Sequence, residues 1–180
     1  MFSAAVSMLP DYGWRSQGLW AIDTANANCF ETCASNVLRP SQADVTLMQE
    51  TKLHTEDSMK AAKRKARGLG WSAHFSPARL TDAAGKSGGC GVAAKLGAGI
   101  APVDDLDIDP DLQHRIAISW VDAVQRGGIY CASAYLANTE GFTEYNMKVL
   151  QEAAAVVKSL KAPWAMGGRL EQHASRTPRH

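Results

Sequence analysis

The stretch ADVTLMQETKL, Ala43–Leu53, begins as a buried strand and ends in charge. Val45, Leu47 and Met48 are apolar, and the β-branched Thr46 also suits a strand. The polar residues then come together, in the order Gln49, Glu50, Thr51 and Lys52. A carboxylate at this point has two interpretations. Either the strand has simply reached solvent, or Glu50 holds a metal ion at the open end of a sheet.

Strand and helix signals alternate on both sides of this stretch. Phe30, Cys33 and Val37 recur at helical spacing before Pro40, which stops that helix, and Thr55 can cap the next one. We expect strands at Gly18–Ala25, Asp44–Gln49, Trp71–Ala78, Gly89–Leu96, His114–Ala123, Gly128–Leu136 and Pro163–Gly168, and helices at Cys29–Pro40, Thr55–Gly70 and Thr143–Leu160.

The order of these elements predicts a mixed α/β fold. A β-α-β-α start is followed by several strands and then by α-β, and two sheets packed together with helices outside would bury this pattern. The segments Thr81–Gly89 and Ala101–Asp111 are expected to be loops, and Ala123–Gly128 suits an antiparallel hairpin. We expect one domain at 18–168, with an N-terminal extension at 1–17 and an unpatterned tail at 169–180.

Composition places the chain among ordinary soluble proteins. The 180 residues are 46% hydrophobic and 21% charged, enough for one domain with a sizeable core. The net charge of +1 argues neither for nor against a nucleic-acid partner. No apolar run is long enough to span a bilayer, and residues 1–17 lack the basic and apolar regions of a signal peptide.

The cysteines predict free thiols rather than a metal site. Cys29, Cys33, Cys90 and Cys131 form no CxxC pair, and no histidines cluster near them, so we do not expect zinc. Buried free thiols favour a reducing intracellular compartment, without specifying an organelle. The oligomeric state is left open.

Polar side chains follow the ends of three expected strands. Asn26 and Asn28 come after the first, Glu50 after the second, and Tyr135 and Asn138 at the end of the strand Gly128–Leu136. Oxygen ligands from several strand ends suit a hard cation such as Mg²⁺. Such an ion can polarise a phosphoryl oxygen and stabilise a leaving oxyanion, so the pattern points to phosphate-ester chemistry. The alternatives are that the asparagines occupy turns or caps, and that Tyr135 is a core aromatic.

Five segments carry a resemblance to the endonuclease/exonuclease/phosphatase superfamily, whose fold is DNase I-like. They resemble, in order, its TWNxN, LQETK, SGGxGV and VYxPN segments and the strand before its GGDxN motif. Each motif alone is weak, but the order and spacing agree over roughly Leu19 to Gly168. The chain is most similar to the endonuclease domains that accompany reverse transcriptases in mobile elements. The segments are TANAN (24–28), LMQETK (47–52), SGGCGVAAK (87–95), AYLANTEG (134–141) and PWAMGG (163–168).

The resemblance implies a four-layer α/β/β/α sandwich of two mixed sheets, incomplete at the C-terminus, and cleavage of phosphodiesters in DNA or another nucleic acid with Mg²⁺ or Mn²⁺. Glu50 would be the metal ligand, with Asn26 beside the metal and the attacking water. Tyr135 would orient the phosphate or the attacking group, and Asn138 would contact phosphate. Asn28 is a weaker candidate for the metal shell, and no residue is assigned to an organic cofactor.

Several positions depart from the family pattern. Ala25 and Ala137 replace an aromatic residue and a proline, Arg169 stands where the family has an acid, and Glu171 stands where it has asparagine. His173 and His180 lie in the unpatterned tail and not in the family's final motif, which supplies the general base. We therefore expect weak metal binding that depends on Glu50, and no turnover by this chain. The alternatives are a degenerate non-catalytic fragment, or a relative that hydrolyses phospholipids or inositol phosphate esters.

Overall fold

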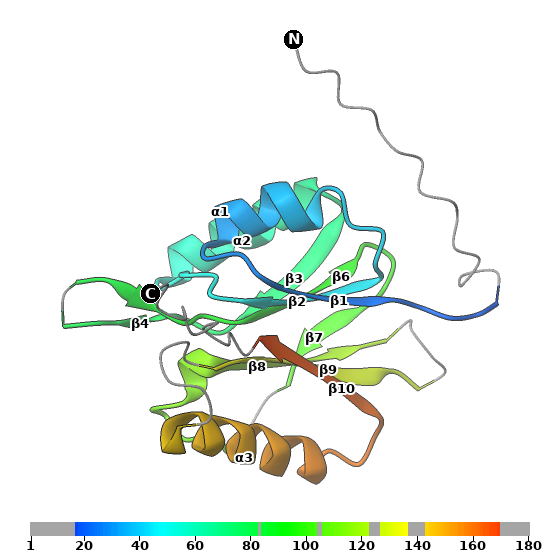
Figure 1. Cartoon of the computed structure of the whole chain (residues 1–180). Coiled ribbons are helices and arrows are strands. Elements are labelled where there is room, and N and C mark those ends of the chain that lie inside the picture. The colour runs from blue at the N-terminus through cyan, green and yellow to red at the C-terminus, as the bar shows by residue number, and fades with distance from the viewer. Residues whose placement is uncertain (1–16, 83, 104–105, 123–126, 137–142, 170–180) are drawn as a thin grey trace, which may run out of the picture.

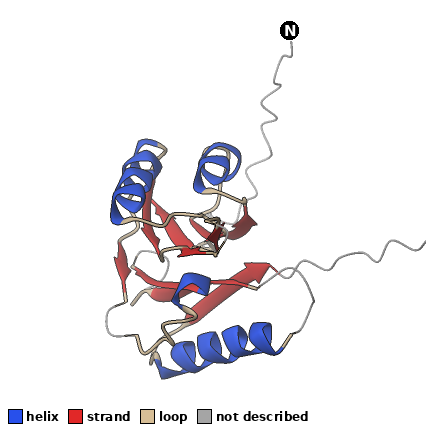
Figure 2. Cartoon of the chain, turned by 90° about the vertical axis from the view of Figure 1, so that its left-hand side faces the viewer, coloured by secondary structure: helices blue, strands red, loops and turns tan. Residues whose placement is uncertain are grey.

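The computed structural model describes residues 17–82, 84–103, 106–122, 127–136 and 143–169, and arranges them in four layers. Two helices lie above one sheet, a second sheet packs beneath the first, and a third helix covers the far side (Figure 1). A view from the side separates the layers as α/β/β/α (Figure 2). This is the predicted architecture, and the α/β fold class is confirmed.

The first sheet is built around the stretch that opened the sequence analysis. Its strand order is β1-β2-β6-β3, in which β1 and β2 are parallel and the other neighbours antiparallel. Every residue of β2 is buried, so this strand lies at the centre of the fold. The strands are β1 (Ile22–Asn26), β2 (Val45–Gln49), β3 (Trp71–Phe75) and β6 (Gly91–Lys95).

The second sheet repeats this mixture of directions. Its strand order is β10-β9-β8-β7, and only β10 and β9 are parallel. In both sheets, therefore, one edge strand is parallel to its neighbour and the other pairs are antiparallel, so both sheets are mixed, as predicted. The strands are β7 (Ile100–Pro102), β8 (Ile116–Val121), β9 (Ile129–Tyr135) and β10 (Trp164–Arg169).

The helices begin where the sequence supplies caps. Thr55 accepts from the Ser58 backbone N–H, and the Ser58 hydroxyl accepts from the Thr55 N–H, which closes a capping box. Thr143 caps the last helix by accepting from the Asn146 N–H. The helical elements are α1 (Phe30–Cys33) with its π-helical continuation η1 (Ala34–Leu38), α2 (Glu56–Gly68), the short 3₁₀ turn η2 (Gln113–Arg115) and α3 (Glu144–Ser159).

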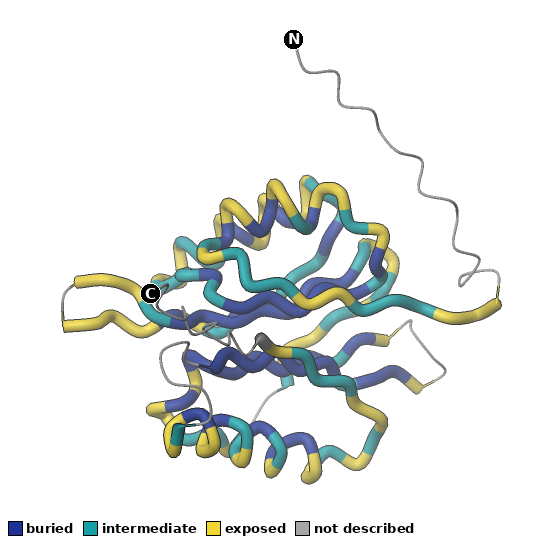
Figure 3. Tube along the Cα trace, in the orientation of Figure 1, coloured by how far each residue is buried: buried dark blue, intermediate teal, exposed yellow. Residues whose placement is uncertain are grey.

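The core has three levels, which Figure 3 shows as buried tube between exposed helix faces. The upper level packs aromatic residues of α1 and β3 together, with the rings of Phe30 and Phe75 edge to face at 5.3 Å. Aliphatic side chains such as Leu47 and Val92 fill the space between the sheets. The lower level lies under α3 and includes Val149. Apolar side chains therefore fill most of the space on both faces of each sheet, and a few polar residues of the strands are buried there as well.

Three short strands lie in or beside the segments that we expected to be loops. Strands β4 (Arg79–Leu80) and β5 (Lys86–Ser87) form a hairpin that projects from the body of the molecule (Figure 1). The strand β7 begins at the edge of the second expected loop. These strands have two or three residues, too few for a period-two pattern to stand out. The hairpin predicted at 123–128 lies mostly outside the described residues.

The cysteines and the membrane expectation can be compared directly with the structure. All four cysteines are free thiols, three of them buried and Cys29 half-buried. Burial raises the pKa of Cys33, Cys90 and Cys131 to about 12, so these thiols stay protonated. Among the helices of the described residues, none has the length and apolarity to cross a membrane.

Candidate functional site

The end of β2 turns sharply just where the sequence becomes polar. Glu50 and Lys52 both have a φ of 56°, in the left-handed region that costs a residue with a side chain about 1 kcal/mol or more. The glycines before β6 hold this turn. The Thr51 N–H donates to the Gly89 carbonyl (2.9 Å) and the Lys52 N–H to the Gly88 carbonyl (3.2 Å). These two hydrogen bonds therefore hold the chain in a left-handed turn at Glu50, where the strand ends.

The Glu50 carboxylate is held by two donors. The Tyr135 hydroxyl donates to Oε1 at 2.7 Å and the Lys52 ammonium at 2.9 Å, and only 13% of the Glu50 side chain is exposed. Burial raises the pKa of Glu50, but the hydrogen bonds from Lys52 and Tyr135 and the lysine charge outweigh it, so the pKa lies below its usual value. The carboxylate is therefore ionised at neutral pH.

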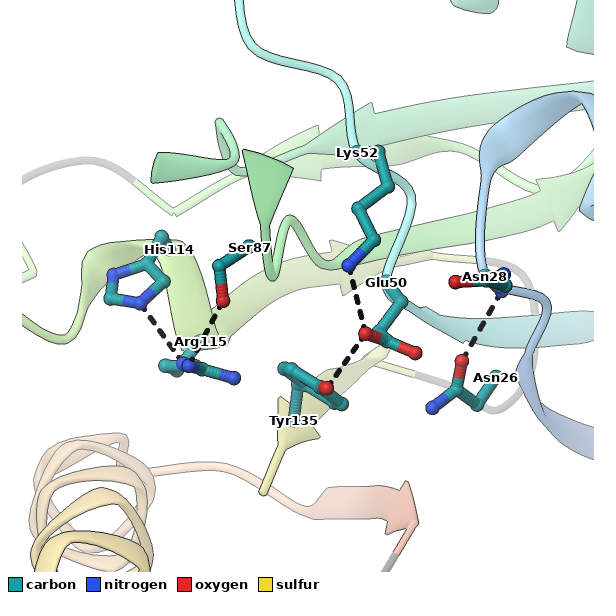
Figure 4. Close-up of polar contacts among 8 residues, drawn as sticks. All are labelled: Asn26, Asn28, Glu50, Lys52, Ser87, His114, Arg115 and Tyr135. Atoms are coloured by element: carbon teal, nitrogen blue, oxygen red, sulfur yellow. Dashed lines mark hydrogen bonds and ion pairs between the residues drawn. The ribbon is translucent and has the colours of Figure 1, made fainter. Parts of the chain in front are cut away.

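Tyr135 brings the second sheet to this carboxylate. It is the last residue of β9, far from Glu50 in sequence, and only 5% of it is exposed. Burial and the neighbouring Glu50 raise the pKa of Tyr135, so its hydroxyl keeps the proton that it donates. The two strand ends thus meet across the sandwich through one hydrogen bond, and Figure 4 shows the contact.

The asparagines form a turn beside the carboxylate. Asn26 ends β1, and its Oδ1 accepts from the Asn28 N–H at 3.3 Å, so the expected turn role is present. The Asn26 amide also helps to lower the pKa of Glu50. Its Nδ2 atom is nevertheless buried without a hydrogen-bond partner. An acceptor oxygen of a ligand could satisfy this donor.

Arg115 lies on the other side of Tyr135. Its Nε donates to His114 Nε2 (2.9 Å) and its Nη2 to Ser87 Oγ (3.2 Å). The guanidinium carbon lies 4.6 Å from the centroid of the Tyr135 ring. Figure 4 shows the side chains in a row, from His114 and Arg115 through Tyr135 to Glu50 and Asn26.

The structure brings three of the four predicted site residues together, namely Asn26, Glu50 and Tyr135. Asn138 lies outside the described residues, and so do Glu171 and the histidines of the tail. Arg169 ends β10 in register with Tyr135, which places its backbone beside the site. Sequence reasoning missed two residues. Lys52 was inside a quoted motif, but its contact depends on the left-handed turn, and Arg115 carried no signal because its burial comes from packing.

The donor set fits a hard cation to a limited extent. Both hydrogen bonds to the Glu50 carboxylate go to Oε1, and Figure 4 shows the second oxygen on the side of Asn26. A rotated Asn26 amide would present its own oxygen there, and oxygen ligands suit Mg²⁺ or Mn²⁺. In the part of the chain that the structure describes, no group of three or more acidic, histidine or cysteine side chains is placed to hold a metal. These residues would leave most of the ion's ligands to water.

The chain resembles known proteins in its structure and not in its sequence. No protein-family model and no curated protein matches the chain. Among solved structures, ANGEL2, a 2′,3′-cyclic phosphatase, in complex with adenosine-2′,3′-vanadate, is 15% identical with a TM-score of 0.55, covering 83% of this chain and 52% of that one. The AP endonuclease LMAP from Leishmania major is 15% identical with a TM-score of 0.51, covering 82% and 54%. TDP2 from C. elegans is 10% identical with a TM-score of 0.53, covering 99% and 57%.

These likenesses show the fold. The chain has the DNase I-like fold of the endonuclease/exonuclease/phosphatase superfamily, which confirms the predicted resemblance at this level. It spans about half the length of the structures that it matches.

Proposed function

We propose that the chain carries a metal-dependent phosphodiesterase site of the endonuclease type that acts on nucleic acid. The observation that carries the proposal is Glu50: an ionised, largely buried carboxylate on a left-handed turn, held by Tyr135 from the opposite sheet. Strained backbone of this kind is retained where a site requires it. Glu50 would bind Mg²⁺ or Mn²⁺, with the Asn26 amide as its neighbour.

The charges of the site suit a phosphodiester. Lys52 neutralises Glu50, and the Arg115 guanidinium adds a further positive charge beside Tyr135. A bound divalent ion supplies polarisation of the phosphoryl oxygen and stabilisation of the leaving oxyanion. Tyr135 keeps its proton, so it can orient the carboxylate in the resting site or donate to a phosphoryl oxygen. Asn138 is proposed as a phosphate contact on the resemblance alone.

The substrate class is supported by what similar folds do. One similar structure is that of a 2′,3′-cyclic phosphatase and another that of an AP endonuclease, and both names describe chemistry on phosphate esters of nucleic acid. We therefore place nucleic acid, with DNA first, ahead of phospholipid or inositol phosphate substrates. The similarity to endonucleases of mobile elements stays a prediction from the sequence.

We further propose that this chain binds the metal weakly and does not turn over. Arg169 stands at the end of β10 where the family carries an acid, beside Tyr135 in register. On the resemblance, this position would bring a positive charge towards the cation instead of a ligand, and like charges a few Å apart cost on the order of 1 to 4 kcal/mol, depending on the local dielectric. The Lys52–Glu50 ion pair adds to this, because the ammonium places a positive charge on the same carboxylate that would bind the cation. That pair is also what favours the second candidate, a non-catalytic binding domain.

Calorimetry and a cleavage assay test the proposal together. We expect Mg²⁺ and Mn²⁺ to bind the full chain weakly and not to bind Glu50→Gln, with no cleavage of plasmid, abasic or single-stranded DNA. Tight binding that survives Glu50→Gln would place the metal elsewhere and overturn the site. Cleavage by the wild type that disappears in Glu50→Ala would overturn the proposal that the chain is inactive, and it would support the phosphodiesterase site. Loss of that cleavage in Glu171→Ala would show that Glu171 supplies the acid that the family carries at the position of Arg169.

A further inference from the structure

A buried glutamine and a buried serine lie between the two sheets, next to the candidate site. Gln49 is the last residue of β2, and Ser133 is part of β9. Leu47 and Cys131 come two residues earlier on the same faces of these strands, and both belong to the apolar level between the sheets. The polar pair therefore ends an apolar row, and buried polar groups require hydrogen-bond partners.

Two hydrogen bonds join the pair across the sandwich. Gln49 Nε2 donates to Ser133 Oγ at 2.9 Å, and the Ser133 hydroxyl donates to the Met48 carbonyl at 2.8 Å. The Gln49 amide is also held within its own sheet, because Nε2 donates to Thr24 Oγ1 (3.2 Å) and to the Leu47 carbonyl (3.3 Å). We call the Gln49 amide, the Ser133 hydroxyl and the Met48 carbonyl the cross-sheet clamp.

The cross-sheet clamp immediately precedes the site on both strands. Gln49 is followed by Glu50 at the turn that ends β2. Ser133 lies two residues before Tyr135, so both side chains are on the same face of β9. A change in the spacing of β2 and β9 at the clamp would therefore be passed on to the 2.7 Å hydrogen bond between Tyr135 and Glu50.

Hydrogen bonds define this spacing more narrowly than apolar contacts do. The hydrophobic effect has no direction, whereas a hydrogen bond is lost when its length or angle changes. Sliding of one sheet over the other would leave the clamp groups buried and unsatisfied, which costs more than the bonds contribute. The clamp therefore favours one alignment of the two strand ends.

We propose that Ser133 and Gln49 are positioning residues, which hold the ends of β2 and β9 where the Tyr135 hydroxyl reaches the Glu50 carboxylate. This inference rests on the proposed function for what the carboxylate binds, and on the hydrogen bonds of the clamp for the positioning itself. Both residues are buried, so they act on the site through Glu50 and Tyr135.

Titration of Glu50 in the full chain tests the clamp, with the carboxyl carbon followed by carbon-13 NMR in the absence of divalent cations. The hydrogen bond from Tyr135 helps to lower the pKa of Glu50, so Tyr135→Phe should move the midpoint to higher pH. Ser133→Ala and Gln49→Met should move it in the same direction, by no more than Tyr135→Phe does. A role in stability alone would ease unfolding without moving this midpoint.

Ser119→Ala is the matched control. Ser119 is a buried serine of β8, and its hydroxyl lies 3.1 Å from Nδ1 of His74 on β3, so it also joins the two sheets. Its partner in register on β9 is Cys131, four residues before Tyr135, and β6 separates β3 from β2. This variant should leave the Glu50 midpoint at the wild-type pH.

The outcomes separate the clamp from the metal site. A wild-type midpoint in Ser133→Ala, or equal shifts in Ser133→Ala and Ser119→Ala, would overturn the positioning role. If Ser133→Ala does not fold, an unchanged midpoint in Gln49→Met would overturn it instead. Failure of the proposed function appears in a different measurement, as metal binding that survives Glu50→Gln.

Discussion

Two buried charges flank Tyr135, and their surroundings differ. Glu50 has an ammonium and a hydroxyl on one oxygen, whereas Arg115 has an imidazole, a serine and two aromatic rings. The first charge is compensated by a described residue, whereas no carboxylate among the described residues forms an ion pair with the second. The two charges therefore differ in what holds them: an ion pair for Glu50, and neutral groups and packing for Arg115.

The same two glycines support both sides. Gly88 and Gly89 accept from the turn that carries Glu50, and the Gly89 N–H donates to the carbonyl of His114, next to Arg115. Their φ values are 73° and 81°, which favour glycine. These contacts make the two glycines part of a tight turn and of close packing between strand ends. Changes at the glycines should therefore disturb both charges, while changes at either charge should disturb one.

The largest expected effect is that of Gly88→Ala. A Cβ at this position would lie 2.5 Å from the His114 carbonyl oxygen, and the residue has a positive φ. Steric overlap and backbone strain together should lower the free energy of unfolding by about 2 to 4 kcal/mol in denaturant titration. Gly68→Ala is the matched control, because its Cβ would meet nothing within 4 Å, and it should change stability by less than about 1 kcal/mol. Equal effects at the two glycines would remove Gly88 as the shared support.

Low pH should destabilise the fold through His114, which lies beside Arg115. Burial and Arg115 hold the folded-state pKa at about 4, below the ordinary value of 6.5. Between these values the unfolded chain binds more protons, so stability rises with pH and is lost as pH falls from 6.5 towards 4. From pH 7 to pH 5 this loss is about 2 kcal/mol. The free energy of unfolding, measured between pH 7 and pH 5, should change less with pH in His114→Gln than in the wild type.

Arg115→Met offers a check on the cause of that slope. Removing the guanidinium should weaken the pH dependence without abolishing it, because burial is the larger cause of the lowered pKa. A slope that is unchanged in both variants would place the acid-sensitive group elsewhere in the molecule.

Lys52→Met should leave the negative charge of Glu50 without its ion-pair partner. The variant leaves the Glu50 carboxylate with only the Tyr135 hydroxyl on Oε1, and we expect a loss of about 1 to 2 kcal/mol in the free energy of unfolding. The lowered pKa of Glu50 contributes stability above its ordinary value of 4.5, which disappears as pH falls through the folded-state pKa. Without Lys52 the folded-state pKa should rise towards the ordinary value, so this acid-dependent loss should become smaller. Divalent cations should bind the variant more tightly, because a competing positive charge is gone.

An exposed ion pair gives the control for Lys52. Lys60 pairs with Glu56 on the surface of α2, and Lys60→Met should cost less than about 0.5 kcal/mol. If Lys52→Met costs no more than this, the turn at Glu50 does not depend on the ion pair, and the contrast between the two sides of Tyr135 loses its basis.

The sequence predicted the layers and one side of the site well. The apolar residues between Val45 and Gln49 predicted a buried strand, and every residue of β2 is buried in the structure. The order of the motifs placed Glu50 and Tyr135 at strand ends, and the fold brings these two residues into contact. The two-residue strands of the β4–β5 hairpin had no pattern long enough to recognise. Arg115 could not be found, because an arginine next to a strand reads as exposed until packing buries it.

The smallest expected effect is that of Tyr145→Ala. The ring lies 5.5 Å from the Arg115 guanidinium and is partly exposed, so the lost cation–π contact should cost about 0.5 to 1 kcal/mol. Tyr135, whose ring is closer and buried, should cost more when changed to Ala, because packing and the hydroxyl contact to Glu50 are lost as well. Chemical denaturation of the two variants measures this difference. A small loss would show that Tyr145 is a peripheral contact of Arg115, whereas a loss as large as that at Tyr135 would make Tyr145 part of the fixed support of the guanidinium.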